Sequence, residues 1–531
     1  MRRPKTFFMA DAKYDDVIRA LRERGWRSSD NSKDDASLVW QNLATTDFEA
    51  LRPHQLVNHM RGIQVLSHKA TLARLAFDAP AYPRCYDLRS RAHAGALVGH
   101  YARVVAAAVV VAAAAAEGRE DGREDGRDGE DAAAACVDLL NETATTTTLP
   151  SATLLARLFG VSGGLETWTV DAARRRCRWT PELVARGRRA LEGAAWAHGV
   201  VEGSFRNIWI VKPAGGSCGD GIACVSSLSE LVEIARAARW RVVAQRYVER
   251  PFLVRKKKFD IRQWVLITSA SPLIVWGLDR CYARFAAKDW NLENLEDRFA
   301  HLCNYSVQRE FSGPSPVVVE DAFPPFQGNM WHSADLAAYV GADDWEAVVE
   351  PQIRSLSVSV AKLAATTGLA KVANGFEWLG LDIILAEDLS AWLLEVNVSP
   401  DVSRSTPVTA DLVPAATEDA LRLLLDERHA EDGRRTSRNP PIAPDRRRQR
   451  PGGGRSAARW VLWFDDDEAT IQSSGDQAQD RTPNFRRRYK YVADPPDALD
   501  TWWADLMAST RREADAQDDD DDDDDDDDTE L

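Results

Sequence analysis

The sequence predicts a mixed fold of α-helices and β-strands (α/β, of the α+β kind), and two stretches carry this prediction. Residues 207–248 read as a strand, a glycine-rich loop, a helix and a second strand in succession. Residues 376–398 hold two apolar runs around a polar turn, and they follow an amphipathic helical pattern at residues 344–367. Strand and helix patterns that alternate along a chain are typical of a sheet covered by helices.

The composition limits the classes of protein to which the chain can belong. With 531 residues, 44% of them hydrophobic, it is long enough for several domains with buried cores. The formal charge is −15, but residues 518–528 are all aspartate, so the rest of the chain carries only about −4. A body without net positive charge argues against nucleic-acid binding. Seven cysteines without CxxC spacing argue against a disulfide framework or a zinc site and fit a reducing compartment.

The sequence predicts a cytoplasmic monomer with no membrane partner. The apolar patch near the N-terminus spans only four residues, which is too short for a signal peptide. The apolar run at residues 104–116 spans 13 residues, most of them alanine, which is too short to cross a bilayer.

Residues 1–200 are predicted to form an N-terminal domain, with a strand at residues 37–41, a helix at residues 62–76 and a mainly helical stretch from residue 139. Within it, residues 112–135 are alanine blocks around a charged, glycine-rich repeat. Such a segment buries too little apolar area to offset its ordering entropy, so we expect a disordered insertion. The arginines of residues 174–189 either form a solvated helix face or guide an acidic substrate.

The glycine-rich loop at residues 213–221 lies between a strand (residues 207–212) and a helix (residues 228–238), with a second strand at residues 241–248. Loops in this position present backbone N–H groups to phosphate. The glycine spacing matches neither a Walker A motif nor a dinucleotide-binding fingerprint, so an ordinary turn explains it equally well.

The strand predicted at residues 259–268 places Asp260 and Arg262 on one face, because side chains alternate along a strand. A strand pair at residues 273–285 follows and ends near Arg284. These arginines can be catalytic, or they can form ion pairs on the face of the sheet.

The apolar runs at residues 376–398 predict a β-hairpin. A turn centred between Asp388 and Leu389 sets Asp382 directly opposite Glu395, and Asn397 points to the same face as Glu395. Facing carboxylates repel, and a buried carboxylate without a partner costs several kcal/mol. A Mg²⁺ ion resolves both problems through all-oxygen ligation. The alternative is an edge hairpin with solvated acids.

After residue 425 the chain becomes polar. We therefore expect residues 426–531 to be mostly a disordered linker and an acidic tail. Short tryptophan-containing segments at residues 459–464 and 498–506 can dock locally.

Residues of about 200–425 resemble the tubulin tyrosine ligase-like family, a branch of the ATP-grasp ligases. The motifs that carry the resemblance occur in order: WIVKP, GDGI, QRYVERP, KKFDIRQW, YARF, HLCNYS and LDIIL…WLLEVNVSP. HLCN, NMW and SPDVSRSTPVTADL are most similar to the glycylating branch, as are QLVNHMRGIQVLSHKATLARL and YPRCYDL nearer the N-terminus. The resemblance implies an ATP-grasp fold, with a central lobe at residues 201–252 and a C-terminal lobe at residues 253–425 that carries the metal site.

The resemblance also implies a set of site residues. Arg262 and Arg284 would be catalytic, neutralising the γ-phosphate and the acceptor carboxylate. One or two Mg²⁺ ions would be held by Asp382, Glu395 and Asn397. The α/β-phosphates of ATP would be bound by Lys212 and Lys258, and the loop glycines Gly219 and Gly221 would also bind ATP. The adenine would be surrounded by Gln245, Arg246, Tyr247 and Val248, and the ribose would be bound by Asp260. Asn304, and Cys303 through packing, would complete the ATP site.

The implied activity joins glycine to glutamate side chains of acidic tubulin tails through an acyl phosphate. Free glycine and tubulin or microtubules would be the partners, in the cytoplasm, the cytoskeleton or the axoneme of a cilium or flagellum. The alternatives are a polyglutamylase or tyrosine ligase of the same fold, and an inactive nucleotide-binding relative. The last is motivated by Cys218 and Asp220, which stand where relatives carry basic residues.

Overall fold

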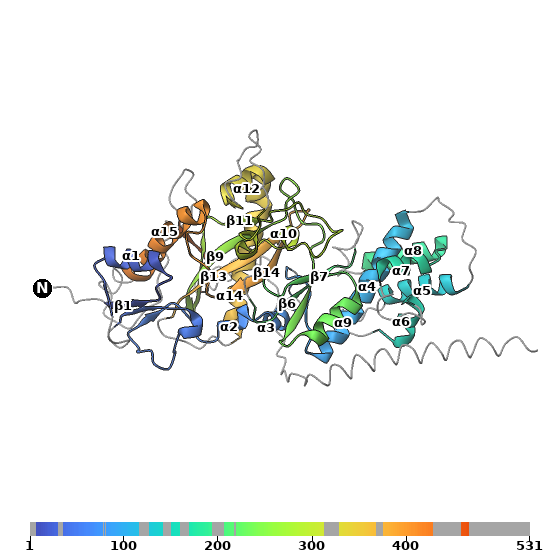
Figure 1. Ribbon diagram of the computed structural model, residues 1–531, viewed down its shortest axis with the longest axis horizontal. Helices are drawn as coiled ribbons and strands as arrows, with labels where there is room; N and C mark the ends of the chain where they lie inside the picture. The colour runs from blue at the N-terminus through green and yellow to red at the C-terminus, as the bar shows by residue number, and fades with distance from the viewer. Residues whose placement is uncertain are drawn as a thin grey trace, which may run out of the picture. The chain divides into compact units, whose positions relative to one another are not determined.

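The computed structural model describes residues 7–29, 36–77, 79, 81–115, 127–141, 150–159, 169–193, 206–216, 219–312, 329–367, 375–427 and 458–466. The chain forms two compact units (Figure 1). Unit 1 comprises residues 1–83, 217–219 and 250–486, and unit 2 comprises residues 84–216, 220–249 and 487–531. Loop residues 217–218, the predicted docking segment at 498–506 and the poly-aspartate run lie outside the described residues.

The division differs from the predicted N-terminal domain of residues 1–200, which is shared between the two units. The reason is strand β5 (Cys85–Asp87), which pairs antiparallel with β8 (Val242–Arg246). This pairing draws the chain after residue 83 into the sheet of unit 2.

Unit 1 begins with a small parallel sheet of order β2-β1-β3-β4. The strand predicted at residues 37–41 is confirmed as β3, whereas the helix predicted at residues 62–76 is two helices, interrupted where His68 has an extended backbone. The elements are β1 (Phe7–Ala10), α1 (Asp15–Glu23), β2 (Arg27–Ser28), β3 (Leu38–Trp40), η2 (Leu43–Thr45), β4 (Leu56–Val57), α2 (Gln64–Ser67) and α3 (Lys69–Leu75).

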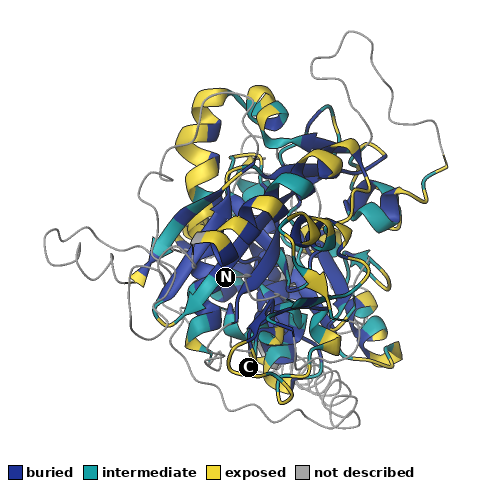
Figure 2. Ribbon diagram, turned by 90° about the vertical axis from the view of Figure 1, so that its left-hand side faces the viewer, coloured by how far each residue is buried: buried dark blue, intermediate teal, exposed yellow. Residues whose placement is uncertain are grey.

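The main sheet of unit 1 is antiparallel and is organised around β9 (Phe259–Ala270), which pairs with β10, β11 and β13. Side chains of its buried strands pack against α15, and α14 contacts β9, β10 and β14. Figure 2 shows the buried residues concentrated in the interior strands and the exposed ones on helices and loops. The other elements are β10 (Leu273–Leu278), β11 (Tyr282–Phe285), α10 (Arg298–His301), α11 (Tyr305–Gln308), β12 (Met330–His332), α12 (Ser333–Val340), α13 (Ala342–Asp344), η5 (Trp345–Val349), α14 (Glu350–Thr366), β13 (Glu377–Leu385), β14 (Ala391–Asn397), α15 (Pro407–Leu421) and η6 (Arg422–Glu427).

A strand from the predicted linker region completes the main sheet. β15 (Trp460–Asp465) pairs antiparallel with β10, so this part of residues 426–531 is ordered. The Trp463 ring lies over Gly277, where a Cβ atom would come within 2.2 Å of it. The tryptophans that make this segment apolar therefore dock it onto the sheet.

Unit 2 combines a small sheet of order β5-β8-β6-β7 with a set of helices. The strand, glycine loop, helix and strand predicted at residues 207–248 are present, and Ser227 and Glu230 form a capping box on α9. The elements are α4 (Arg91–Ala115), α5 (Arg127–Asn141), α6 (Ala152–Phe159), α7 (Val170–Arg176), α8 (Pro181–Gly193), β6 (Trp209–Pro213), β7 (Ala223–Val225) and α9 (Leu228–Ala237).

The apolar run of unit 2 is longer than predicted. Helix α4 has 25 residues and an 18-residue window of mean hydropathy 1.8, so by length and composition it could cross a membrane. However, 83% of that window is buried, and α4 packs against α5, α7 and α8. The predicted disorder is wrong for residues 112–115 and 127–135: alanine favours helices, so α4 extends to Ala115 and α5 begins at Arg127. Residues 116–126 lie outside the described part.

A buried acid joins the N-terminal part of unit 1 to the start of β13. Glu377 lies 2.9 Å from His59 Nδ1 and accepts the Met60 backbone N–H at 2.9 Å. Burial raises the pKa of Glu377 to about 7, against the lowering effect of its hydrogen bond to His59. The other ring nitrogen of His59 lies 2.9 Å from the Gln41 carbonyl oxygen, which can only accept. A protonated Glu377 can donate to His59 Nδ1.

This pair predicts a pH dependence of stability. Between about pH 4.5 and pH 7 the folded state keeps a proton on Glu377 that the unfolded state has released. The free energy of unfolding should therefore fall as pH rises through this window, by up to about 1.4 kcal/mol per pH unit. Glu377→Gln, which preserves both hydrogen bonds, should remove this slope in urea unfolding at pH 5, 6 and 7. Exposed Glu346→Gln is the control, and equal slopes for wild type and Glu377→Gln would contradict the assignment.

Candidate active site

Four charged side chains form a buried cluster across strands β11, β9 and β13. Arg262 donates from Nε to Asp382 Oδ1 at 2.5 Å, and Arg284 donates from Nε to Asp260 Oδ1 at 2.6 Å. Arg284 Nη2 lies 2.8 Å from both Asp260 Oδ2 and Asp382 Oδ2, which joins the two pairs into one network. The sheet register explains the grouping, because Arg284 pairs with Asp260 and Arg262 pairs with Asp382.

A glycine makes room for this cluster. Gly380 lies on β13 two residues before Asp382, and a Cβ atom there would be 3.2 Å from Arg262 Cδ and 2.9 Å from Pro400 Cβ. A side chain at this position would crowd the arginine against the sheet. Glycine inside a strand often marks such a close approach. This signal was present in the sequence, although Gly380 was not among the predicted site residues.

The arginines control the ionisation of the two aspartates. Burial alone would raise the pKa of Asp382, but the charges and hydrogen bonds of Arg262 and Arg284 hold it well below its usual range. Burial raises the pKa of Asp260, with Arg284 opposing the shift. Asp382 is therefore held in its ionised form, which is the state that a cation ligand requires.

The hairpin pairs Asp382 with Glu395 as the sequence predicts, but Leu385 pairs with Ala391, so the turn is centred on Asp388 and not between Asp388 and Leu389. Asp382 faces Glu395 across β13 and β14, with a bulge directly after Asp382. Asn397 Nδ2 approaches Asp382 Oδ2 at 3.4 Å, so the three predicted metal ligands lie on one stretch of the hairpin. Two carboxylates and an amide suit a hard divalent cation, and the side chains present fit Mg²⁺. In the described part of the chain no group of three His, Cys, Asp or Glu residues gathers that could hold a metal ion, and the third predicted ligand here is an amide.

Glu395 has a cationic neighbour that the sequence prediction missed. Lys69 Nζ, at the start of α3, lies 3.4 Å from Glu395 Oε2. Both side chains are partly shielded, with 12% and 21% of their surfaces exposed. Lys69 lies in a motif that supported the resemblance, but nothing in its spacing shows that it meets a residue more than 300 positions away.

The remaining predicted residues of unit 1 gather near the start of β9. Buried Lys258 donates from Nζ to the His301 carbonyl oxygen at 2.7 Å. Gly219 has a φ of +81°, and a Cβ atom there would lie 2.6 Å from Val307 Cγ2 and 3.6 Å from Asn304 Oδ1. The loop backbone thus packs directly beside Asn304. Burial raises the pKa of Cys303 to about 12, so this side chain is a neutral thiol that packs.

The residues of unit 2 that are predicted to bind the nucleotide include one buried hydrogen-bonded pair and three residues at the end of β8 and just after it. Lys212 and Gln245 are buried together, with Lys212 Nζ donating to Gln245 Oε1 at 2.7 Å. The Arg246 side chain instead bonds Asn207 Oδ1 and Glu249 at 3.0 Å each, so it holds the fold together. The Tyr247 backbone N–H bonds the Ile208 carbonyl oxygen at 3.1 Å, and Val248 follows β8.

The glycine loop also contains Cys218 and Asp220, the residues that motivate the inactive alternative. Gly221 has a φ of +67°, with a Cβ position 3.0 Å from Pro213. Asp220 between the two loop glycines is exposed, whereas Cys218 lies outside the described residues. An exposed carboxylate is screened by solvent, so its cost to phosphate binding is small.

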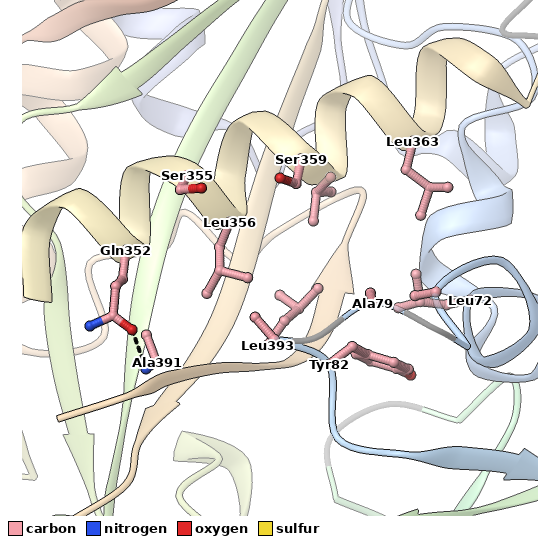
Figure 3. Close-up of a pocket in the computed structure, with 13 residues that line it drawn as sticks. Leu72, Ala79, Tyr82, Gln352, Ser355, Leu356, Ser359, Leu363, Ala391 and Leu393 are labelled. Carbon is pink, nitrogen blue, oxygen red and sulfur yellow. Dashed lines mark hydrogen bonds between the residues drawn. The ribbon is translucent and has the colours of Figure 1, made fainter. Parts of the chain in front are cut away.

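A separate cavity of about 170 Å³ lies between α3, α14 and β14 (Figure 3). Leu72, Leu356, Leu363 and Leu393 line it, and Gln352 Oε1 accepts the Ala391 backbone N–H at 3.0 Å at one end. Its lining contains no Asp, Glu, Lys, Arg or His. It therefore offers no charged side chain to a ligand.

Comparison with known proteins gives a consistent result. The profile of the tubulin-tyrosine ligase family matches residues 137–431, which is more than half of the chain. Tubulin monoglycylase TTLL3 of Danio rerio is 38% identical over 234 residues, covering 42% of this chain and 29% of that protein. Tubulin glycylase 3D of Tetrahymena thermophila is 34% identical over 225 residues, covering 41% and 21%. Protein monoglycylase TTLL8 of Homo sapiens is 35% identical over 236 residues, covering 42% and 26%.

The chain spans less than a third of the length of these relatives, so the likeness concerns their shared domain. The mixed helix and sheet architecture agrees with the predicted fold class, and the resemblance read from the motifs is confirmed. The chain belongs to the tubulin-tyrosine ligase family.

Proposed function

We propose that this chain is an ATP-dependent ligase that joins glycine to the side-chain carboxylates of glutamates in acidic tubulin tails. The relatives that it matches in a fish, a ciliate and humans are all named as glycylases. These names favour glycine as the added amino acid over glutamate or tyrosine. The observation that carries the proposal is the buried cluster of Arg262, Arg284, Asp260 and Asp382 beside Glu395. The proposed partners are free glycine and microtubules, which would place a monomeric enzyme at the cytoskeleton, including axonemes.

The chemistry of ligation requires this kind of charge arrangement. A carboxylate is a poor acyl donor, so ATP would convert it to an acyl phosphate before the glycine amine attacks. Phosphate and carboxylate repel each other, and two fixed guanidinium groups offset that repulsion as they approach. Arg262 and Arg284 are held by Asp260 and Asp382, so they are oriented before a substrate arrives.

The residues assigned to ATP would contact different parts of the nucleotide. Lys212 and Lys258 would place positive charge on the phosphates, and the backbone at Gly219 and Gly221 would donate N–H groups to them. The Gln245 amide and the backbone of Arg246 to Val248 would contact the adenine, while Asp260 would accept from the ribose. Cys303 and Asn304 would complete the phosphate end of the site.

Asp382, Glu395 and Asn397 would hold Mg²⁺. The ion would supply charge neutralisation to the transferring phosphoryl group. Of the two residues that motivate the inactive alternative, Asp220 is exposed to solvent and Cys218 lies outside the described residues.

The first prediction of the proposed function concerns the hairpin of β13 and β14, which carries the proposed metal ligands. Glu395→Gln removes a ligand charge while keeping the side-chain shape, so it should lower incorporation of labelled glycine into purified tubulin at least a hundredfold. The wild-type protein should incorporate glycine and not glutamate in the same assay with Mg-ATP. Glu387→Gln, at the exposed turn of the same hairpin, should retain activity. Full activity of Glu395→Gln would rule out the metal assignment, and glutamate incorporation alone would move the chain to the glutamylating branch.

The second prediction concerns the glycine loop. Gly219→Ala places a Cβ atom against Val307 at a positive φ, which should strain the loop by about 1–3 kcal/mol. We expect the KM for ATP to rise roughly tenfold, and the thermal midpoint to fall by a few degrees because the strain is in the folded state. Gly215→Ala is the matched control, because a Cβ atom at Gly215 meets nothing within 4 Å. The same KM in both variants would show that the loop does not contact ATP.

A further inference from the structure

Two cysteines that are far apart in the sequence meet in the helical part of unit 2. Cys136 lies within α5, and Cys177 directly follows α7. Their sulfur atoms are 3.7 Å apart, although the residues are separated by 41 positions. Cys136 is fully buried and Cys177 is partly exposed. The activity proposed above uses neither side chain.

We propose that Cys136 and Cys177 form a reversible disulfide bond when the protein meets a small-molecule disulfide such as glutathione disulfide. A disulfide has an S–S distance of about 2.05 Å, so the sulfurs need to approach by about 1.7 Å. Cys177 has an extended backbone (φ −71°, ψ 130°), which leaves its side chain outside the steric limits of the helix. Rotation of this one side chain toward α5 is the smallest movement that closes the gap.

The packing around the pair keeps the two sulfurs together. Cys177 packs against a small apolar cluster formed by Ala133, Val137 and Leu183. Ala133 and Val137 lie on the same helix as Cys136, one turn before and one position after it. The contact is thus built into the interface between α5 and the segment that joins α7 to α8.

The difference in exposure assigns a role to each thiol. Cys177 can be reached by a small molecule, and exposed arginines flank it at positions 174, 175, 176 and 178. Positive charge there attracts glutathione disulfide, which is an anion. Burial raises the pKa of the Cys136 thiol well above its usual value, so it reacts only with a partner already beside it.

The reaction balances without any further reactant. The Cys177 thiolate attacks one sulfur of glutathione disulfide, which forms a mixed disulfide and expels one glutathione thiolate. Cys136 then loses its proton and attacks the Cys177 sulfur, which forms the internal disulfide and expels the second glutathione thiolate. Two protein thiols are oxidised and one glutathione disulfide is reduced to two glutathione molecules. The bond ties α5 to the end of α7.

The test uses the full-length protein equilibrated in buffers of increasing glutathione disulfide to glutathione ratio. Remaining thiols are alkylated under denaturing conditions and located by peptide mass spectrometry. Wild-type protein should lose alkylation at Cys136 and Cys177 together, with one midpoint, and yield a peptide pair joined through these residues. The thermal midpoint of the oxidised protein should rise by roughly 5 °C.

Variants separate the proposed bridge from unspecific oxidation. Cys136→Ala should accumulate glutathione on Cys177, and Cys177→Ser should leave Cys136 fully alkylated. Cys224→Ala, which removes a partly exposed cysteine on β7, should behave as wild type. The proposal fails if wild-type Cys177 keeps glutathione while Cys136 stays alkylated, if Cys177 does not react, or if either cysteine bridges to another. The wild-type result is decisive even where a variant folds poorly.

Discussion

The neutralisation of buried charge within one sheet constrains the rest of unit 1. Arg262, Arg284, Asp260 and Asp382 are all buried, and removing one partner of such a pair typically costs about 3–5 kcal/mol. The strands that carry them must therefore keep their register, because a slip by one residue would turn every charge to the opposite face. The long strand β9 meets this requirement by pairing with β11 on one side and β13 on the other. Gly380 then leaves the space in which Arg262 can lie.

This arrangement also explains how one carboxylate can serve two roles. Asp382 accepts from both arginines and faces Glu395 across the hairpin. Since its pKa is held low by those arginines, it needs no proton release before it can bind a cation. The same arginines remain charged and fixed, as transfer of a phosphoryl group requires. Ion pairing on the sheet face and the proposed catalysis, which were alternatives at the level of sequence, are thus compatible.

The sequence predicted those parts of the site that depend on local geometry. Asp382 and Glu395 were placed opposite each other because they are equally distant from the turn, and Asp260 and Arg262 shared a face because strands alternate. Contacts between distant segments could not be predicted in this way. The Lys69 contact with Glu395, the docking of β15 over Gly277 and the meeting of Cys136 with Cys177 each depend on tertiary packing. The alanine-rich helix ends were misread because low complexity masked a strong helix propensity.

The N-terminal segment of unit 1 holds both strands of the hairpin formed by β13 and β14. His59 and Met60 bind Glu377 at the start of β13, and the Ala81 carbonyl oxygen accepts the Leu393 backbone N–H of β14 at 2.9 Å. Lys69 contacts Glu395 between these points. Residues that lie outside the matched family profile therefore fix the position of proposed ligands inside it. A hairpin joined only at its turn can splay, whereas one held along both strands keeps its carboxylates facing each other. The geometry of the proposed metal site thus depends on the N-terminal segment of unit 1 as well as on the hairpin itself.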